Sequence, residues 1–268
     1  YHYIPHSSRS ERHVGLIATV FVRFAIDSIM AVEERSAFGR RLESATERYL
    51  DRIGDCVSAL PPLVEGYETG TEYRQVVSRI QYFESACDEL KLELGKLLTS
   101  ADSADVGLRL TWIDLHADRM LGLYDHLDTI ANTSEQFAEE LAALSPERRT
   151  DCLDGLVPMA KLSAAAMIEL ERVVVEFVRS LCRPAYATSI SSGVSKIRAL
   201  EGESDAVRNR VLEAAFDGEH DGDALVYRQF AVLLDGVLDA MEDVTDQMHL
   251  IAGSEGWFEI QVYPPCGY

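Results

Sequence analysis

The sequence predicts an all-α protein built from two tandem three-helix bundles, with six long helices in all. Three observations lead to this fold class. Apolar residues recur at helical spacing along most of the chain, and no stretch shows the clean alternation of a strand. The eight prolines are few for 268 residues and fall mainly between the periodic segments. Two phrases of the first half of the chain also recur, in the same order, in the second half.

The expected helices follow one another through short polar connections. The pair Pro61-Pro62 is expected to end the first helix, and Pro158 is expected to kink or break the fourth. Beyond the last helix, residues 254–268 form an aromatic and irregular C-terminal tail. The expected bounds of the six helices are 39–60, 72–98, 106–143, 147–181, 188–215 and 223–252.

The apolar segment from Val14 to Val32 raises the question of a membrane span. Arg23 interrupts it after nine apolar residues, whereas a spanning helix needs about 20. No clear small-x-small cleavage site of a signal peptide follows. We therefore expect no membrane insertion and interpret residues 1–37 as an N-terminal extension. The phrase "MAVEERSAFGRR" resembles an ordinary amino terminus, so the extension is expected to begin upstream of a native start at Met30.

Charge and cysteine usage indicate the compartment and exclude some partners. The net charge is −20, and most basic residues are Arg, which predicts a high-salt cytoplasm such as that of a halophilic archaeon. No block of Lys and Arg is available to neutralise phosphates, so nucleic acid is not an expected partner. The five cysteines form no CxxC pair, so neither a disulfide framework nor a zinc ribbon is indicated.

The chain contains an internal repeat. "SRIQYFESACDEL" (78–90) aligns with "SKIRALEGESDAV" (195–207) at an offset of 117 residues. "LDTIANTSEQF" (127–137) aligns with "LDAMEDVTDQM" (238–248) at an offset of 111, and length changes between helices are tolerated in the connecting hairpin. The repeat predicts a first unit over 38–145 and a second unit over 146–253.

Carboxylates gather on two neighbouring helices of the second unit. At about 100° per residue, most of the acids on the last helix share one face, away from its apolar stripe. These acids are Asp235, Asp239, Glu242, Asp243 and Asp246. Glu201 and Asp205 lie one turn apart on the preceding helix, so an antiparallel pair could bring four or more carboxylates into one groove. Such a groove would favour a hard cation with oxygen ligands, and Fe, Mn, Mg and Ca all stay open.

The first unit reproduces this pattern incompletely. Glu84 and Asp88 correspond to Glu201 and Asp205, and Asp128 corresponds to Asp239. Tyr124, however, stands where Asp235 would be, and Ala131 where Glu242 would be. We therefore expect the second unit to bind metal better than the first. The alternative is a solvated helix face, because a highly acidic surface is rich in carboxylates in any case.

The order and spacing of these pieces resemble the PhoU-like proteins, in particular the phosphate transport regulators that accompany Pit-type phosphate transporters. The matching pieces run from "RLESATERYLDRIGDCVSALPPLVEGYETG" (41–70) to "YRQFAVLLDGVLDAMEDVTDQMHLIA" (227–252), and the likeness covers roughly 38–253. The resemblance implies that the family's acid-x-x-x-Asp motif, which holds metal clusters in relatives, maps to Asp235-x-x-x-Asp239. In the first unit it maps to Tyr124-x-x-x-Asp128, where the first acid is missing.

The resemblance implies a non-catalytic regulator of phosphate uptake in the cytoplasm, at the inner face of the membrane. The expected partner is a membrane phosphate transporter of Pit type, and a homo-oligomer stays open. Two alternatives also stay open: a helical scaffold without metal, and a carboxylate-bridged di-metal enzyme. The enzyme usually needs two Glu-x-x-His motifs, and Asp246-x-x-His249 is the only near match. No Gly-rich phosphate loop is present.

Overall fold

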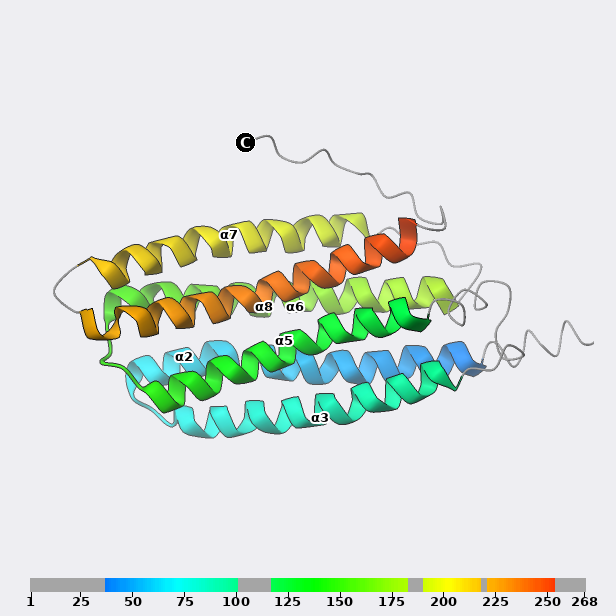
Figure 1. Cartoon of the computed structure of the whole chain (residues 1–268), viewed down its shortest axis with the longest axis horizontal. Helices are drawn as coiled ribbons and strands as arrows, with labels where there is room; N and C mark the ends of the chain where they lie inside the picture. The colour runs from blue at the N-terminus through cyan, green and yellow to red at the C-terminus, as the bar shows by residue number, and fades with distance from the viewer. Residues whose placement is uncertain (1–36, 101–116, 183–189, 218–220, 254–268) are drawn as a thin grey trace, which may run out of the picture.

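The computed structural model describes residues 37–100, 117–182, 190–217 and 221–253, and every secondary-structure element in these ranges is an α-helix. The expected all-α fold is therefore confirmed. The first helix covers residues 37–58 and is the blue helix of Figure 1. The helices that follow are α2 (Leu60–Thr69), α3 (Tyr73–Thr99), α5 (Ala117–Leu144), α6 (Thr150–Cys182), α7 (Ser191–Phe216) and α8 (Asp221–Gly253). Residues 1–36 of the expected extension, the tail, residues 106–116 of the third expected helix and residues 188–189 of the fifth lie outside the described residues.

The first helix ends at residue 58, just before Pro61 and Pro62, but the two prolines then begin a further helix where a connection was expected. They occupy the first turn of α2, where a backbone N–H has no intrahelical partner to lose. The chain therefore continues as helix directly after Ala59. Its end comes at Gly70, whose φ of 75° lies in the left-handed region that glycine enters without strain.

Pro158 lies inside α6, which continues unbroken to Cys182, so the expected break does not occur. A proline at an interior position removes one backbone hydrogen bond. Leu156, Met159 and Ala160 around it are fully buried, and packing of this apolar face against the neighbouring helices offsets the loss.

The helices lie along one long axis and form two groups, as Figure 1 shows. The first helix with α2, α3 and α5 makes up the lower group, and α6, α7 and α8 make up the upper group. The groups are joined because α5 packs against α8, where Phe137 and Phe230 meet edge to face with ring centroids 5.8 Å apart. One hydrophobic core runs through both groups. The grouping follows the internal repeat, while the exact unit boundaries stay a prediction.

None of the described helices combines the length and the apolar composition that crossing a bilayer requires. The acids of both repeat units lie along the paired helices of one group each, α3 with α5 and α7 with α8. These two helix pairs position the candidate site.

Candidate functional site

The pair α7 and α8 brings four carboxylates together. Glu201 and Asp205 come from α7, and Asp235 and Asp239 come from α8. A guanidinium joins the two sides, because Arg208 of α7 forms ion pairs with both Asp205, at 2.7 Å, and Asp235. We name Glu201, Asp205, Asp235 and Asp239 the second acid cluster.

Asp235 is the most deeply placed member of the second acid cluster, with 3% of its surface exposed. One of its oxygens accepts a hydrogen bond from Ser204 at 3.2 Å, and the other accepts one from Arg208. Burial raises the pKa of Asp235, and the guanidinium of Arg208 opposes this rise. A buried carboxylate is therefore held between a hydroxyl and a cation of the protein itself.

Glu201 and Asp239 carry negative charge that the single guanidinium does not balance. Burial raises the pKa of Glu201 to about 7, with further contributions from Asp205 and the acids of α8. Burial and the neighbouring Asp235 raise the pKa of Asp239 to about 6, against the lowering effect of Arg208. Both groups therefore lose their protons at a higher pH than an ordinary Asp or Glu does.

The three other acids predicted on α8 are bound by cations or rings of neighbouring helices, and of these Glu242 also adds to the raised pKa of Glu201 and Asp239. Arg198 of α7 binds Glu242, with Nε 3.3 Å from Oε1, and also binds Asp246. Asp243 faces α5, where one of its oxygens is 4.0 Å from Nδ1 of His126. These acids form partly exposed ion pairs between helices, which contribute little to stability.

In the first unit, Asp128 of α5 is enclosed by donors of the protein and is 7% exposed. Tyr49 of the first helix donates a hydrogen bond of 3.1 Å to one oxygen. Lys91 of α3 and Asn132 of α5 donate to the other, at 3.0 and 2.9 Å. Lys91 also forms an ion pair with Asp125 at 2.8 Å. The Asp128 carboxylate thus accepts three hydrogen bonds, one of them from a cation.

Glu84 of α3 repeats the behaviour of Glu201. Burial raises the pKa of Glu84 to about 7, and Glu135, Asp88 and Asp128 add to the rise. The residue that replaces the missing acid, Tyr124, is buried, and its hydroxyl shares a hydrogen bond of 2.6 Å with Thr46. We name Glu84, Asp88 and Asp128 the first acid cluster.

The two cations were not predicted from the sequence, although the aligned repeat places them at equivalent positions. Lys91 and Arg208 are 117 residues apart, which is the offset of the repeat in α3 and α7. Each lies one helical turn beyond Asp88 or Asp205, just past the end of the aligned phrases. Tyr49 was missed as well, and no local signal could have found it because the tyrosine lies 79 residues from Asp128 in the chain.

The donor chemistry of the clusters suits a hard cation, but the arrangement does not suit a multinuclear metal cluster. Across the described ranges, no three Asp, Glu, His or Cys side chains converge as metal ligands would. Asp128 and Asp235, which belong to the expected motif, already accept hydrogen bonds from Lys91 and Arg208. Glu201 and Asp239 remain as carboxylates with uncompensated charge. Metal binding by the ten predicted residues stays a prediction.

The parts of a di-metal enzyme are not assembled in the described residues. Asp246 pairs with Arg198, and a ring nitrogen of His249 lies 2.8 Å from the carbonyl of Thr245 on its own helix. The thiols of Cys56 and Cys87 are buried, and the hydrogen bond with Cys87, together with burial, raises the pKa of Cys56. A protonated, buried thiol is a packing group and a poor nucleophile.

Known protein families and known structures give different results. No family model matches the chain, and no curated protein matches it. Two solved structures from Shewanella oneidensis MR-1 do match, one described as a PhoU-like phosphate regulatory protein and the other as a PhoU-like protein. Each has a TM-score of 0.65 at 18% sequence identity. The matches cover 80% and 79% of this chain, and 99% of each of the two solved chains.

At this identity the likeness concerns the fold. The Pit-type subfamily and a halophilic archaeal source stay predictions. The two helix groups that carry the acid clusters thus form an architecture already seen in solved structures. The chain has the fold of PhoU-like phosphate regulatory proteins.

Proposed function

We propose that this protein is a non-catalytic regulator of inorganic phosphate uptake that acts in the cytoplasm by binding a Pit-type membrane transporter. The observation that carries the proposal is the PhoU-like fold, shared over about four-fifths of the chain with a protein described as a phosphate regulatory protein. The internal repeat in the sequence supports it, because the two helix groups follow that repeat.

The chemistry of the interior also favours regulation over catalysis. The two most buried carboxylates of the clusters, Asp128 and Asp235, are held by Lys91 and Arg208 and by neighbouring hydroxyls. Groups in such pairs maintain a fixed arrangement of helices, whereas a catalytic acid or base needs access to a substrate. A binding protein needs no more than this rigid scaffold and an outer surface.

A cation would bind in the second unit under this proposal. Glu201 and Asp239 would hold a hard divalent ion that keeps several of its water molecules, as Mg²⁺ does when one or two carboxylates bind it. The raised pKa values of both groups support this assignment, because burial and neighbouring carboxylates both disfavour their charged forms, and a cation would offset these effects. The bound ion would neutralise the face between α7 and α8.

The same fold supports a second candidate, a helical scaffold that binds a protein partner without metal. Lys91 and Arg208 favour this candidate, since they already supply positive charge to both acid clusters. Metal content distinguishes the two candidates, while both predict a protein partner.

Co-purification from cross-linked membranes tests the regulatory proposal. The tagged chain should capture a phosphate transporter, and the amount captured should change between cells grown at low and at high phosphate. The control is the same tag on a helical bundle of similar charge. Capture of no transporter at either phosphate concentration would contradict the proposal.

A further inference from the structure

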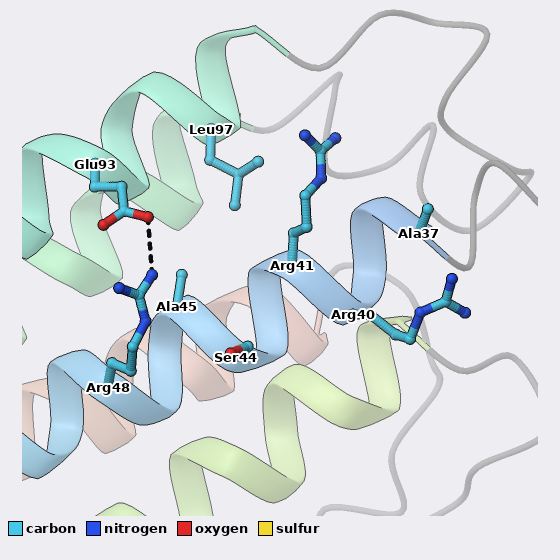
Figure 2. Close-up of a pocket in the computed structure, with 8 residues that line it drawn as sticks. All are labelled: Ala37, Arg40, Arg41, Ser44, Ala45, Arg48, Glu93 and Leu97. Carbon is cyan, nitrogen blue, oxygen red and sulfur yellow. Dashed lines mark hydrogen bonds and ion pairs between the residues drawn. The ribbon is translucent and has the colours of Figure 1, made fainter.

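A hollow lined by arginines lies between the first helix and the end of α3. Its volume is about 540 Å³, which is within the usual range of small-molecule sites. Figure 2 shows the residues that line it, and Arg41, Ser44 and Arg48 follow one face of the first helix. The opposite wall comes from Glu93 and Leu97 of α3. The lining residues are Ala37, Arg40, Arg41, Ser44, Ala45, Arg48, Glu93 and Leu97.

The charge of this hollow is opposite to that of the molecule. Three arginines and one glutamate give it a formal charge of +2, whereas the whole chain carries −20. The acidic surface of the rest of the molecule repels anions, so an anion would bind where guanidinium groups are gathered. Lysine is absent from the lining, and the planar guanidinium binds oxyanions through two parallel hydrogen bonds.

The guanidinium groups of Arg48 and Arg41 differ in whether a carboxylate binds them. Arg48 binds Glu93 at 2.8 Å, and both side chains are about half exposed. Arg41 has no carboxylate within ion-pair distance among the described residues, and Figure 2 shows its side chain extending past Leu97. The two arginines are seven residues apart on one helix face, which separates their Cα atoms by about 10 Å. Ser44 lies between them with a hydroxyl donor.

We propose that this hollow binds a multiply charged phosphate-bearing anion through Arg41, Ser44 and Arg48. A singly charged carboxylate would compete with Glu93 for Arg48 on equal terms, whereas a phosphate or polyphosphate carries more charge and more acceptor oxygens. Such an anion displaces Glu93 from Arg48 and recruits Arg41 at the same time. The ligand is either a free phosphate compound or the phosphate of a lipid headgroup. This site is remote in sequence from the second acid cluster and does not depend on the proposed regulatory function.

Binding of two probes to the full chain tests the site. Tripolyphosphate in solution is measured by calorimetry, and vesicles with and without an anionic phospholipid are measured by co-sedimentation. Arg41→Gln with Arg48→Gln should weaken binding by about tenfold or more, since each charge-assisted hydrogen bond is worth about that factor. The matched control, Arg210→Gln with Arg228→Gln, removes the same charge at two other exposed positions and should leave binding unchanged.

A third variant changes binding in the opposite direction. Glu93→Gln frees Arg48 from its ion pair and should tighten binding severalfold, a result that misfolding cannot produce. Binding of tripolyphosphate with this pattern identifies a soluble ligand, and binding of anionic vesicles alone identifies a lipid headgroup. The proposal is overturned by an absence of binding to both probes, or by equal losses in the Arg41/Arg48 and Arg210/Arg228 variants.

Discussion

The guanidinium of Arg208 lies against the carboxylate of Asp235, an acid that is almost completely buried between α7 and α8. Lys91 and Asp128 form the corresponding pair between α3 and α5. The cations are equivalent in the repeat, but their acids are not: Asp235 aligns with Tyr124, and Asp128 aligns with Asp239. Each unit therefore has one cation at its acid cluster. The acid that this cation binds lies one helical turn further along the partner helix in the first unit than in the second.

Loss of the Arg208 charge should destabilise the protein. Arg208→Met leaves Asp235 buried without its cation, and removing one partner of a buried pair costs about 3 kcal/mol of unfolding free energy. Urea unfolding followed by circular dichroism measures this loss. Arg210→Met, two residues further along α7 and exposed, is the control and should cost far less. Equal losses in the two variants would show that the pair with Asp235 contributes nothing specific.

Restoring neutrality should recover stability. Adding Asp235→Asn to Arg208→Met removes the unpaired buried charge and keeps the hydrogen-bonding shape of the side chain. The double variant should be more stable than Arg208→Met alone by about 1 kcal/mol or more, because neutral buried groups are less costly than charged ones. The same urea unfolding experiment gives the coupling between the two positions, and strict additivity would contradict the account.

Tyr49 should stabilise the first acid cluster through its hydroxyl. Tyr49→Phe removes the hydrogen bond to Asp128 and keeps the buried ring, so the expected loss is about 2 kcal/mol, typical of a hydrogen bond to a charged group. Tyr82→Phe is the control, since that ring is 70% exposed and its hydroxyl should contribute little. Thermal unfolding of both variants checks the difference. A Tyr49→Phe protein as stable as wild type would contradict the role assigned to the hydroxyl.

The protein should become less stable as the pH rises from about 4.5 to about 7. Glu84 and Glu201 have folded-state pKa values of about 7, above the ordinary value of 4.5, so folding favours their protonated forms. Their contribution is present below the ordinary pKa, falls through this window and is lost above it. The melting temperature should therefore be higher at pH 5.5 than at pH 8.

Variants identify the groups behind this pH dependence. Glu84→Gln with Glu201→Gln should reduce the dependence of the melting temperature on pH, because neither amide titrates, while Glu171 and Asp239 keep part of it. Glu203→Gln with Glu213→Gln removes the same charge from exposed positions of α7 and should leave the slope unchanged. A wild-type melting temperature that rises between pH 5.5 and pH 8 would have the wrong sign.

Metal content should follow the second acid cluster. Elemental analysis of protein purified without a His-tag or chelator should find divalent metal in the wild type and less in Asp239→Asn with Glu201→Gln. The Glu203→Gln/Glu213→Gln variant has the same net charge and should retain its metal. Equal metal in wild type and the Asp239/Glu201 variant would leave the metal-free scaffold as the better account.

The sequence predicted the helical class because apolar periodicity indicates it. The repeat predicted a division into two parts, but the first group has a fourth helix, α2, where a connection was expected. Helix ends were less predictable. A proline inside a helix interrupts it, but a proline in the first turn is well tolerated, so Pro61 and Pro62 are compatible with either a helix end or a helix start. A helix starts here because the following segment, α2, has an apolar face to bury.

The candidate site was predictable only in part. Helical spacing placed Glu201 with Asp205, and Asp235 with Asp239, on shared faces, and the structure brings these faces together. The sequence could not show that Glu242 and Asp246 bind Arg198, because this pairing depends on how α7 and α8 are rotated about their axes. The donors around Asp128 come from three helices, and pairings between distant segments leave no local pattern.

Phosphate uptake by intact cells shows whether this protein regulates phosphate transport. Radiolabelled phosphate uptake is measured at low and at high external phosphate in a strain that lacks this gene, with the wild-type gene restored as the control. The account predicts that deletion changes the uptake rate at one or both concentrations and that the restored gene reverses the change. Uptake that is the same with and without the gene at both concentrations would contradict the proposed function.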